Sequence, residues 1–232
     1  MSAPMEQLPL AVSLDPEATW EQWVGRTVTR EIEQAASNLI ETPAATLYVW
    51  GGVGTGKSHL LQAVCQQASA TAIYLPLRSL LDYPPAALLE AIEAADLIAF
   101  DDIDCIDVSR DWQEALFHAY NRCQAANTSM LFSATLAPSA LDSILPDLRS
   151  RLAASTVFQL PIWQLDDFEN LLVNRAAAHG LALTPEATRY LATRLPRTGA
   201  AVAKAMSLID RSSLAQKRSP TVPFLKTLPL GI

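Results

Sequence analysis

The feature that most constrains this chain is a glycine-rich octapeptide that begins at residue 51. It reads Gly51-Gly52-Val53-Gly54-Thr55-Gly56-Lys57-Ser58 and matches the pattern G-x-x-x-x-G-K-[ST]. The run Thr46–Trp50 before it has the composition of a buried strand, and a helical pattern over Lys57–Ala68 follows it. A loop in this context turns its backbone N–H groups and a helix N-terminus toward phosphate oxygens. We therefore predict a phosphate-binding loop (P-loop) over residues 51–58.

A P-loop predicts further chemistry at defined positions. Lys57 would bridge the β- and γ-phosphates, and the Ser58 hydroxyl would ligate Mg²⁺. An acidic partner for the metal is expected at the end of a neighbouring apolar strand, and Leu97–Phe100 is followed by Asp101 and Asp102. We expect Asp101 on the metal and Asp102 to orient or deprotonate an attacking water. The next carboxylates in the chain, those of residues 104 and 107, are expected to be solvated in a loop.

Strand and helix patterns alternate along the first two thirds of the chain. We predict five strands, at Thr46–Trp50, Ala72–Pro76, Leu97–Phe100, Ser129–Ser133 and Thr156–Leu160. The helices are expected over Val24–Ile40, Lys57–Ala68 and Asp111–Ala126, with another opening at Pro84-Pro85. This order is typical of a five-stranded parallel sheet that helices cover on both faces, an α/β fold.

The pattern changes to helices alone after Pro161, and the charge changes with it. Residues 1–163 carry 8 basic and 19 acidic residues, whereas residues 164–232 carry 9 basic and 5 acidic residues. Three helices are expected in the second part, one closed by Gly180, one opening at Thr184-Pro185 and one from Thr198 to Leu214. We therefore divide the chain into an extended arm (1–19), an α/β nucleotide-binding domain (20–162) and a small all-α domain (163–232).

Composition excludes several classes of protein. A formal net charge of −7 argues against a protein whose main task is to grip nucleic acid, since phosphate neutralisation needs surplus Lys and Arg. Three cysteines without metal-type spacing indicate neither a disulfide framework nor a zinc site. No apolar run approaches the ~18 residues that span a bilayer, and the N-terminus lacks the pattern of a secretory signal. We expect a cytoplasmic protein.

Several stretches together resemble one family. The P-loop helix start GGVGTGKSHLL, the Asp101-Asp102 pair and the three-helix lid are similar to the DnaA branch of the AAA+ ATPases. Within that branch the chain resembles the Hda proteins, regulatory inactivators of DnaA. The supporting stretches lie at Trp20–Gly25, Tyr74–Leu77, Trp112–Arg122, Leu145–Leu152 and Val222–Lys226. DnaA itself carries a DNA-binding domain after its lid, and the resemblance places the end of the lid near Ile232, so we do not expect a full initiator.

The resemblance implies roles for residues that the motifs alone do not reach. The bound nucleotide would be ADP or ATP, its base lying against Val24 and Gly25, and His59 would extend the nucleotide-binding set beyond the P-loop. Arg151 falls at the family's arginine finger, and Thr135 at the sensor-1 position, where the family more often has Asp. The family's sensor-2 arginine aligns with Ala200, and Arg197 and Lys204 are the nearest cations. This departure predicts weak hydrolysis by the chain itself.

The N-terminal arm resembles a sliding-clamp-binding peptide, with Gln7, Leu8, Pro9 and Leu10 as its core. A flexible arm can lay two leucines into an apolar groove while the glutamine fixes the register by hydrogen bonds. The resemblance implies docking on the DNA-loaded sliding clamp, the β subunit of DNA polymerase III. It then implies delivery of Arg151 to ATP on DnaA, which leaves inactive DnaA-ADP. Contact with DNA is expected to be indirect or weak, through the cationic lid, and a homodimer is possible.

Two alternatives stay open at this point. One is an autonomous ATP-driven motor or helicase loader of the same branch, which would need steady ATPase activity by this chain alone. The other is a pure adaptor for the clamp or for DnaA, whose P-loop is only structural. Turnover of DnaA-bound ATP with and without this chain separates the adaptor from the regulator.

Overall fold

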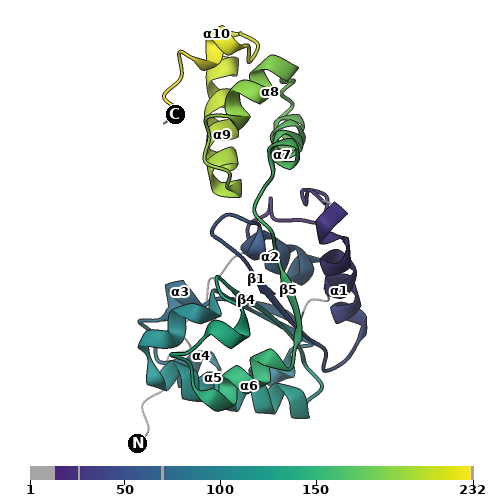
Figure 1. Cartoon of the computed structure of the whole chain (residues 1–232), viewed down its shortest axis with the longest axis vertical. Coiled ribbons are helices and arrows are strands. Elements are labelled where there is room, and N and C mark those ends of the chain that lie inside the picture. Colours follow the sequence, from purple (N-terminus) through teal and green to yellow (C-terminus); the bar gives the residue numbers. More distant parts are fainter. Residues whose placement is uncertain (1–13, 26, 69–70, 231–232) are drawn as a thin grey trace, which may run out of the picture.

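The computed structural model describes residues 14–25, 27–68 and 71–230. The motif Gln7–Leu10 lies outside the described residues. Two parts are visible in Figure 1, an α/β domain and, above it, a cluster of helices that we call the lid. No helix among the described residues combines the length and the apolar character that crossing a membrane would need.

Five parallel strands form the sheet of the α/β domain. They are β1 (Thr46–Trp50), β2 (Ala72–Pro76), β3 (Leu97–Asp101), β4 (Ser129–Ala134) and β5 (Thr156–Gln159). Their order across the sheet is β2-β3-β4-β1-β5, with every neighbouring pair parallel. The predicted parallel five-stranded α/β fold is therefore confirmed. The carboxyl ends of β1, β3 and β4, which carry the P-loop, Asp101 and Thr135, lie at one edge, where ligands bind in open α/β sheets.

Helices cover both faces of the sheet because the strands are apolar on both sides. Alternate residues of β1 enter different cores: Leu47 and Val49 pack beside α1 (Arg30–Glu41) and α2 (Lys57–Gln67), whereas Tyr48 faces the other way. The second core contains Phe100 and Phe132 and the helix α5 (Arg110–Ala125). Shorter helical segments complete the domain: Thr27–Thr29, α3 (Leu77–Leu80), α4 (Pro85–Leu88), Ile92–Ala94, Ile103–Val108, Pro138–Ala140 and α6 (Pro146–Ala153).

Within the described residues the lid has four helices around a core of its own, one more than the three that the sequence predicts, because a short helix follows α9. These are α7 (Leu165–Ala178), α8 (Pro185–Ala192), α9 (Gly199–Gln216) and α10 (Val222–Leu225). The Thr184 hydroxyl caps α8 by accepting from Ala187 N at 3.2 Å, and the Thr198 hydroxyl caps α9 by accepting from Ala201 N at 3.2 Å. Gly180 follows α7 with a φ of +69°, a left-handed conformation that glycine adopts without steric cost.

The predicted helix over Val24–Ile40 is wrong at its start. A 3₁₀ turn over Thr27–Thr29 precedes α1, which begins only at Arg30. Val24 lies outside any helix and packs into the core of the lid, with 8% of its surface exposed. Its apolar spacing therefore reflects burial against the lid and not the apolar face of a helix.

Candidate functional site

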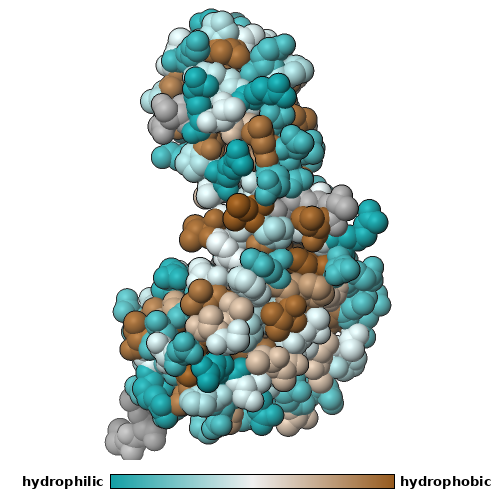
Figure 2. Space-filling model, in the orientation of Figure 1, coloured by the Kyte–Doolittle hydropathy of each residue, from teal (hydrophilic) through white to brown (hydrophobic). Residues whose placement is uncertain are grey.

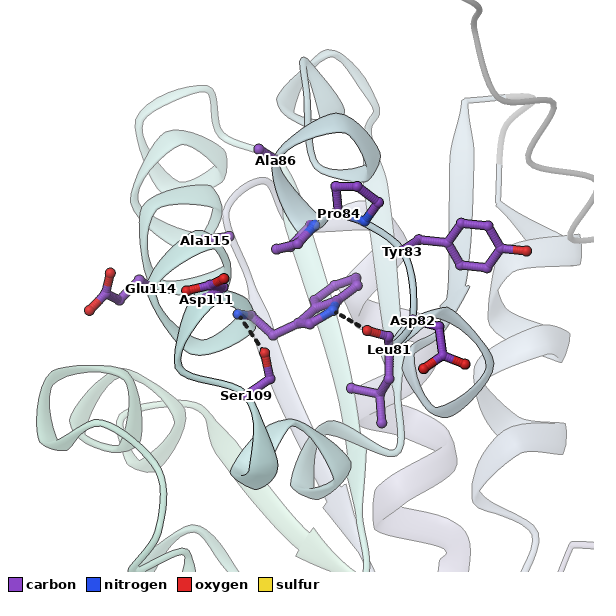
Figure 3. Close-up of a pocket in the computed structure, with 11 residues that line it drawn as sticks. Leu81, Asp82, Tyr83, Pro84, Ala86, Ser109, Asp111, Glu114 and Ala115 are labelled. Carbon is purple, nitrogen blue, oxygen red and sulfur yellow. Dashed lines mark hydrogen bonds between the residues drawn. The ribbon is translucent and has the colours of Figure 1, made fainter.

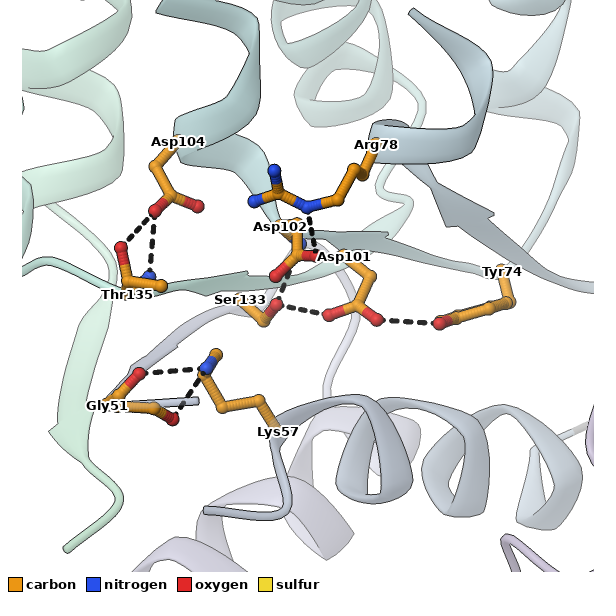
Figure 4. Close-up of polar contacts among 10 residues, drawn as sticks. Gly51, Lys57, Tyr74, Arg78, Asp101, Asp102, Asp104, Ser133 and Thr135 are labelled. Carbon is orange, nitrogen blue, oxygen red and sulfur yellow. Dashed lines mark hydrogen bonds and ion pairs between the residues drawn. The ribbon is translucent and has the colours of Figure 1, made fainter. Parts of the chain in front are cut away.

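The P-loop joins β1 to α2, and its backbone carbonyls accept hydrogen bonds from its own lysine. Lys57 is buried, and its Nζ donates to Gly51 O at 2.8 Å and Gly52 O at 3.1 Å (Figure 4). Burial lowers the pKa of Lys57, and the nearby carboxylates of Asp102, Asp101 and Asp104 oppose that shift. The loop thus holds a cation among backbone groups and beside three carboxylates, while Ser58 lies exposed at the start of α2.

Asp101 is buried at the end of β3 and is held by two hydroxyl groups. Tyr74 Oη donates to one carboxylate oxygen at 2.6 Å, and Ser133 Oγ donates to the other. Burial raises the pKa of Tyr74 most, and the charge of Asp101 and its hydrogen bond with Tyr74 raise it further. A carboxylate oxygen has two lone pairs, so Asp101 keeps acceptor capacity toward a metal ion. The sequence indicated neither hydroxyl, although a serine within the fully buried strand β4 was the available signal.

Asp102 occupies a left-handed turn directly after β3, with φ 56° and ψ 47°. Its backbone N–H donates to Ser133 Oγ at 2.9 Å, and its carboxylate pairs with Arg78 Nε at 3.1 Å. Arg78 extends from α3, and 61% of its side chain is exposed. In this arrangement the carboxylate expected to act on a water molecule is engaged by a cation of the same chain.

Asp104 differs from the expectation of a solvated carboxylate. One of its oxygens accepts hydrogen bonds from both the backbone N–H of Thr135, at 3.1 Å, and the Thr135 hydroxyl (Figure 4). The turn at Asp102 directs the following 3₁₀ segment back toward the end of β4, which brings residues 104 and 135 together. Asp107, in contrast, is exposed as predicted.

The lid meets the P-loop at Gly54. Trp163 Nε1 donates to Gly54 O at 2.9 Å. Gly54 has a φ of +79°, and a Cβ at this position would lie 2.3 Å from Thr198 Cγ2, so only glycine fits beneath the start of α9. Ala200, at the expected sensor-2 position, lies in the first turn of that helix. Arg197 is engaged with Trp163 O at 3.3 Å, and Lys204 is exposed one turn farther along α9.

The segment Trp20–Gly25 lies beside the P-loop helix, where the resemblance predicts contact with the base. A Cβ on Gly56 would lie 3.3 Å from the Trp23 ring, and Trp23 Nε1 donates to Glu33 Oε1 at 2.8 Å. Val24 is buried and Gly25 is exposed in the loop that leads toward α1.

His59 and Arg175 connect three parts of the molecule, and the sequence did not indicate this contact. Arg175, on lid helix α7, donates to His59 Nδ1 at 3.2 Å and to Gln22 Oε1 at 3.1 Å, and it lies 4.0 Å from a carboxylate oxygen of Glu17. His59 Nε2 donates to Thr19 O at 2.9 Å, so the imidazole is the neutral Nε2–H tautomer. No periodicity or motif signals a bond between residues 116 positions apart.

His59 predicts a pH dependence of stability. Burial lowers the pKa of His59, and Arg175 lowers it further, although Thr19 and Asp15 oppose the shift. The unfolded chain therefore binds the proton first as pH falls below ~6.5, and folding stability decreases toward acid pH with a slope of up to ~1.4 kcal/mol per pH unit. Urea unfolding between pH 7.5 and 5.5 should show a flatter slope for His59→Gln than for the wild type. Equal slopes would contradict this assignment.

The other predicted cation sits on α6. Arg151 is exposed in the last turn of this helix, and its side chain makes no hydrogen bond or ion pair within residues 14–25, 27–68 and 71–230. Arg149 on the same helix differs, because its Nη1 pairs with Asp142 at 3.0 Å.

A pocket of about 620 Å³ lies away from all these residues, between α4 and the start of α5 (Figure 3). Tyr83, Pro84, Asp111 and the buried Trp112 are among its lining residues, and Trp112 Nε1 donates to Leu81 O at 3.2 Å. Trp112 therefore packs α5 in the core.

Comparison with known proteins shows the family. Residues 14–159 match the model of the bacterial DnaA ATPase domain, and residues 166–228 match that of the Hda lid domain. This chain belongs to the DnaA-related AAA+ family. It is 35% identical to an uncharacterized protein of Haemophilus influenzae over 229 residues, which cover 96% of this chain and 98% of the relative.

The solved structures of DnaA proteins share this AAA+ fold. Domain III of Thermotoga maritima DnaA superposes with a TM-score of 0.77 at 20% identity, over 89% of this chain and 93% of that one. AMPPCP-bound DnaA from Aquifex aeolicus gives a TM-score of 0.70 at 18% identity, over 88% of this chain and 68% of that one. The predicted α/β sheet followed by a helical lid is therefore confirmed as a DnaA-like AAA+ architecture.

Proposed function

We propose that this chain is an Hda-type regulator that promotes hydrolysis of DnaA-bound ATP. The observation that carries the proposal is the state of Arg151: it lies exposed and unpaired within the described residues, on a DnaA-type ATPase domain that carries an Hda-type lid. A guanidinium delivered across an interface stabilises the charge that develops on a γ-phosphate, an effect worth ~10³ to 10⁵ in rate.

The nucleotide of this chain itself, ADP or ATP, would occupy the P-loop. Gly51, Gly52, Val53, Gly54, Thr55 and Gly56 supply the backbone cradle, and Lys57 would move from the carbonyls of residues 51 and 52 to the phosphates. The base would lie by Val24, Gly25 and His59, beneath the lid. A DnaA of the same fold binds AMPPCP, which supports an adenine nucleotide here.

The residues present suit a magnesium ion bound together with phosphate. The described residues contain no cluster of three or more His, Cys, Asp or Glu that could hold a metal alone. Mg²⁺ in nucleotide sites takes one or two protein oxygens besides phosphates and waters. Ser58 Oγ and the Asp101 carboxylate are such oxygens, and the ion would neutralise phosphate charge when bound.

Hydrolysis by the chain alone is expected to be slow. Ala200 offers no cation at the start of α9, and Arg197 is bonded to Trp163 O. Asp102 is paired with Arg78 through one carboxylate oxygen, so only its other oxygen faces a water molecule without competition from that cation. Thr135 completes the group expected near the γ-phosphate.

The surface beside the nucleotide site is partly apolar. In Figure 2, brown atoms gather where the lid meets the α/β domain. Val53 in the P-loop and Ile162 before α7 are exposed by 84% and 68%. Exposed apolar side chains beside a nucleotide site suit a protein partner such as DnaA better than DNA, which matches an expectation of only indirect or weak DNA contact.

Docking on the sliding clamp is the part that depends on Gln7, Leu8, Pro9 and Leu10. Gln7→Ala should weaken clamp binding about tenfold or more, because the glutamine fixes the register of the peptide by hydrogen bonds. Calorimetry with purified β clamp measures the change. Ser13→Ala, beyond the motif, is the control and should bind like the wild type. An unchanged affinity of the Gln7 variant would remove the motif from the proposal.

One assay tests the whole function. DnaA loaded with radiolabelled ATP is mixed with clamp on DNA, and conversion to DnaA-ADP is followed with and without this chain. Stimulation supports the regulator, whereas clamp binding without stimulation supports a pure adaptor. Rapid ATP turnover by the chain in the absence of DnaA would instead indicate an autonomous ATPase or helicase loader.

A further inference from the structure

The hydrogen bond between Thr135 and Asp104 determines what the threonine can offer to a ligand. A carboxylate accepts hydrogen bonds and donates none. Because Asp104 contacts the Thr135 hydroxyl, that hydroxyl must be the donor, and its single proton is used. The oxygen of Thr135 keeps only acceptor lone pairs for any other partner.

Two further hydrogen bonds fix the position of Thr135 and of the residue after it. Asp104 also accepts the backbone N–H of Thr135, at 3.1 Å, which fixes the backbone and the side chain of the threonine together. On the other side, the buried Tyr48 donates its hydroxyl to Leu136 O at 2.8 Å. The segment that follows β4 is therefore fixed at two consecutive residues, and rotation of the Thr135 hydroxyl is restricted.

The position of this pair relates it to the phosphates. Ala134 O accepts Gly51 N at 3.1 Å, so Thr135 follows directly from a residue bonded to the start of the P-loop. Asp104 is also close enough to Lys57 for its charge to oppose the lowering of the lysine pKa by burial. Thr135 and Asp104 thus lie near the cation expected to bind the terminal phosphates.

Donor and acceptor chemistry then distinguishes two ligands. A γ-phosphate presents acceptor oxygens and gains nothing from an oxygen that can only accept. A water molecule carries protons and can donate one to Thr135. We propose that Asp104 is a positioning residue that commits the Thr135 hydroxyl, so that Thr135 accepts a hydrogen bond from water and does not donate one to the γ-phosphate.

This proposal rests on the proposed nucleotide site and makes Asp104 a determinant of nucleotide preference. In Asp104→Ala the hydroxyl is released and can donate to a γ-phosphate. Such a bond to a charged group should raise the affinity for AMPPCP relative to ADP about tenfold. Asp104→Asn retains an oxygen that accepts from Thr135, so its AMPPCP-to-ADP preference should stay within about threefold of the wild type.

The experiment measures dissociation constants for AMPPCP and ADP by calorimetry, with Mg²⁺, for the wild type, Asp104→Ala, Asp104→Asn, Thr135→Val and the double variant Asp104→Ala with Thr135→Val. In the Thr135→Val background, Asp104→Ala should change the preference less than about twofold, because no hydroxyl remains to be released. Thermal unfolding without nucleotide establishes that each variant folds. If Asp104→Ala does not fold, Asp104→Leu, which also lacks an acceptor and is closer to Asp in size, replaces it.

The outcomes test the role of Asp104 separately from the nucleotide site. An unchanged preference in a folded Asp104→Ala variant overturns the positioning role. Equal shifts in the Asn and Ala variants, or the same shift without the Thr135 hydroxyl, show that the charge of Asp104 acts directly and also overturn it. If the wild type binds neither AMPPCP nor ADP, the proposed nucleotide site itself is wrong, and the role of Asp104 falls with it.

Discussion

Replacing Arg151 by alanine is expected to lower the stimulated hydrolysis of DnaA-bound ATP by about 10³-fold or more. The reason is electrostatic: the guanidinium is the group that would meet the negative charge developing on the γ-phosphate of the partner's ATP. Arg151 makes no hydrogen bond or ion pair among the described residues, so its removal should not disturb the fold. The conversion of DnaA-ATP to DnaA-ADP measures the loss of stimulation. The variant should still bind nucleotide and clamp like the wild type.

Arg149→Ala is the matched control for this experiment. It removes the same charge from the same helix, but from a side chain that pairs with Asp142 at 3.0 Å. An exposed pair of this kind contributes ~0 to 1 kcal/mol to stability, and the variant should retain stimulation. Normal stimulation by the Arg151 variant, or equal loss in both variants, would contradict the finger assignment.

Replacing Lys57 by alanine is expected to weaken binding of ADP and ATP about 100-fold. The buried ammonium group donates to two P-loop carbonyls, and charge-assisted hydrogen bonds to phosphate contribute ~1.5 to 3 kcal/mol. Fluorescence titration with labelled nucleotide measures the effect. If the chain acts on DnaA only when it has bound nucleotide, the stimulated hydrolysis of DnaA-bound ATP should decrease together with the nucleotide affinity.

Lys226→Ala serves as the control for loss of one positive charge, since Lys226 lies exposed in the lid just after α10. It should bind nucleotide like the wild type. Unaltered nucleotide affinity of a folded Lys57 variant would contradict the phosphate site. Lost nucleotide binding with full stimulation of DnaA would instead favour an adaptor whose P-loop is structural.

Much of the fold could be predicted from local patterns in the sequence. The bounds of β1 and β2 are those expected, because each run is short, apolar and ended by glycine or proline. The caps at Thr184 and Thr198 were also predictable, since each is a hydroxyl residue at the start of a helical pattern. The start of α1 was not, because an apolar residue that packs against a distant lid has the same appearance as one on the face of a helix.

The site shows the same division. The sequence predicted Lys57, Ser58, Asp101 and Asp102 because the P-loop and the strand ending in two aspartates are contiguous motifs. It did not indicate that Tyr74 and Ser133 donate hydrogen bonds to Asp101. It also did not indicate that Asp104 accepts hydrogen bonds from Thr135 instead of being solvated. These contacts join residues 27 to 32 positions apart, and no local period encodes them.

By itself, the sequence determined that a phosphate loop lies between a strand and a helix of a parallel sheet and that a cationic all-helical part follows. Those features depend on the order of neighbouring residues and on the side-chain periods of two in strands and 3.6 in helices, which can be read within a short stretch of sequence. Only the tertiary structure decided how Arg175 links the lid to His59, why Gly54 admits no side chain beneath Thr198, and which partner accepts the hydrogen bond of the Thr135 hydroxyl. These features depend on the distances between separate elements, which the packing of the sheet and the lid sets.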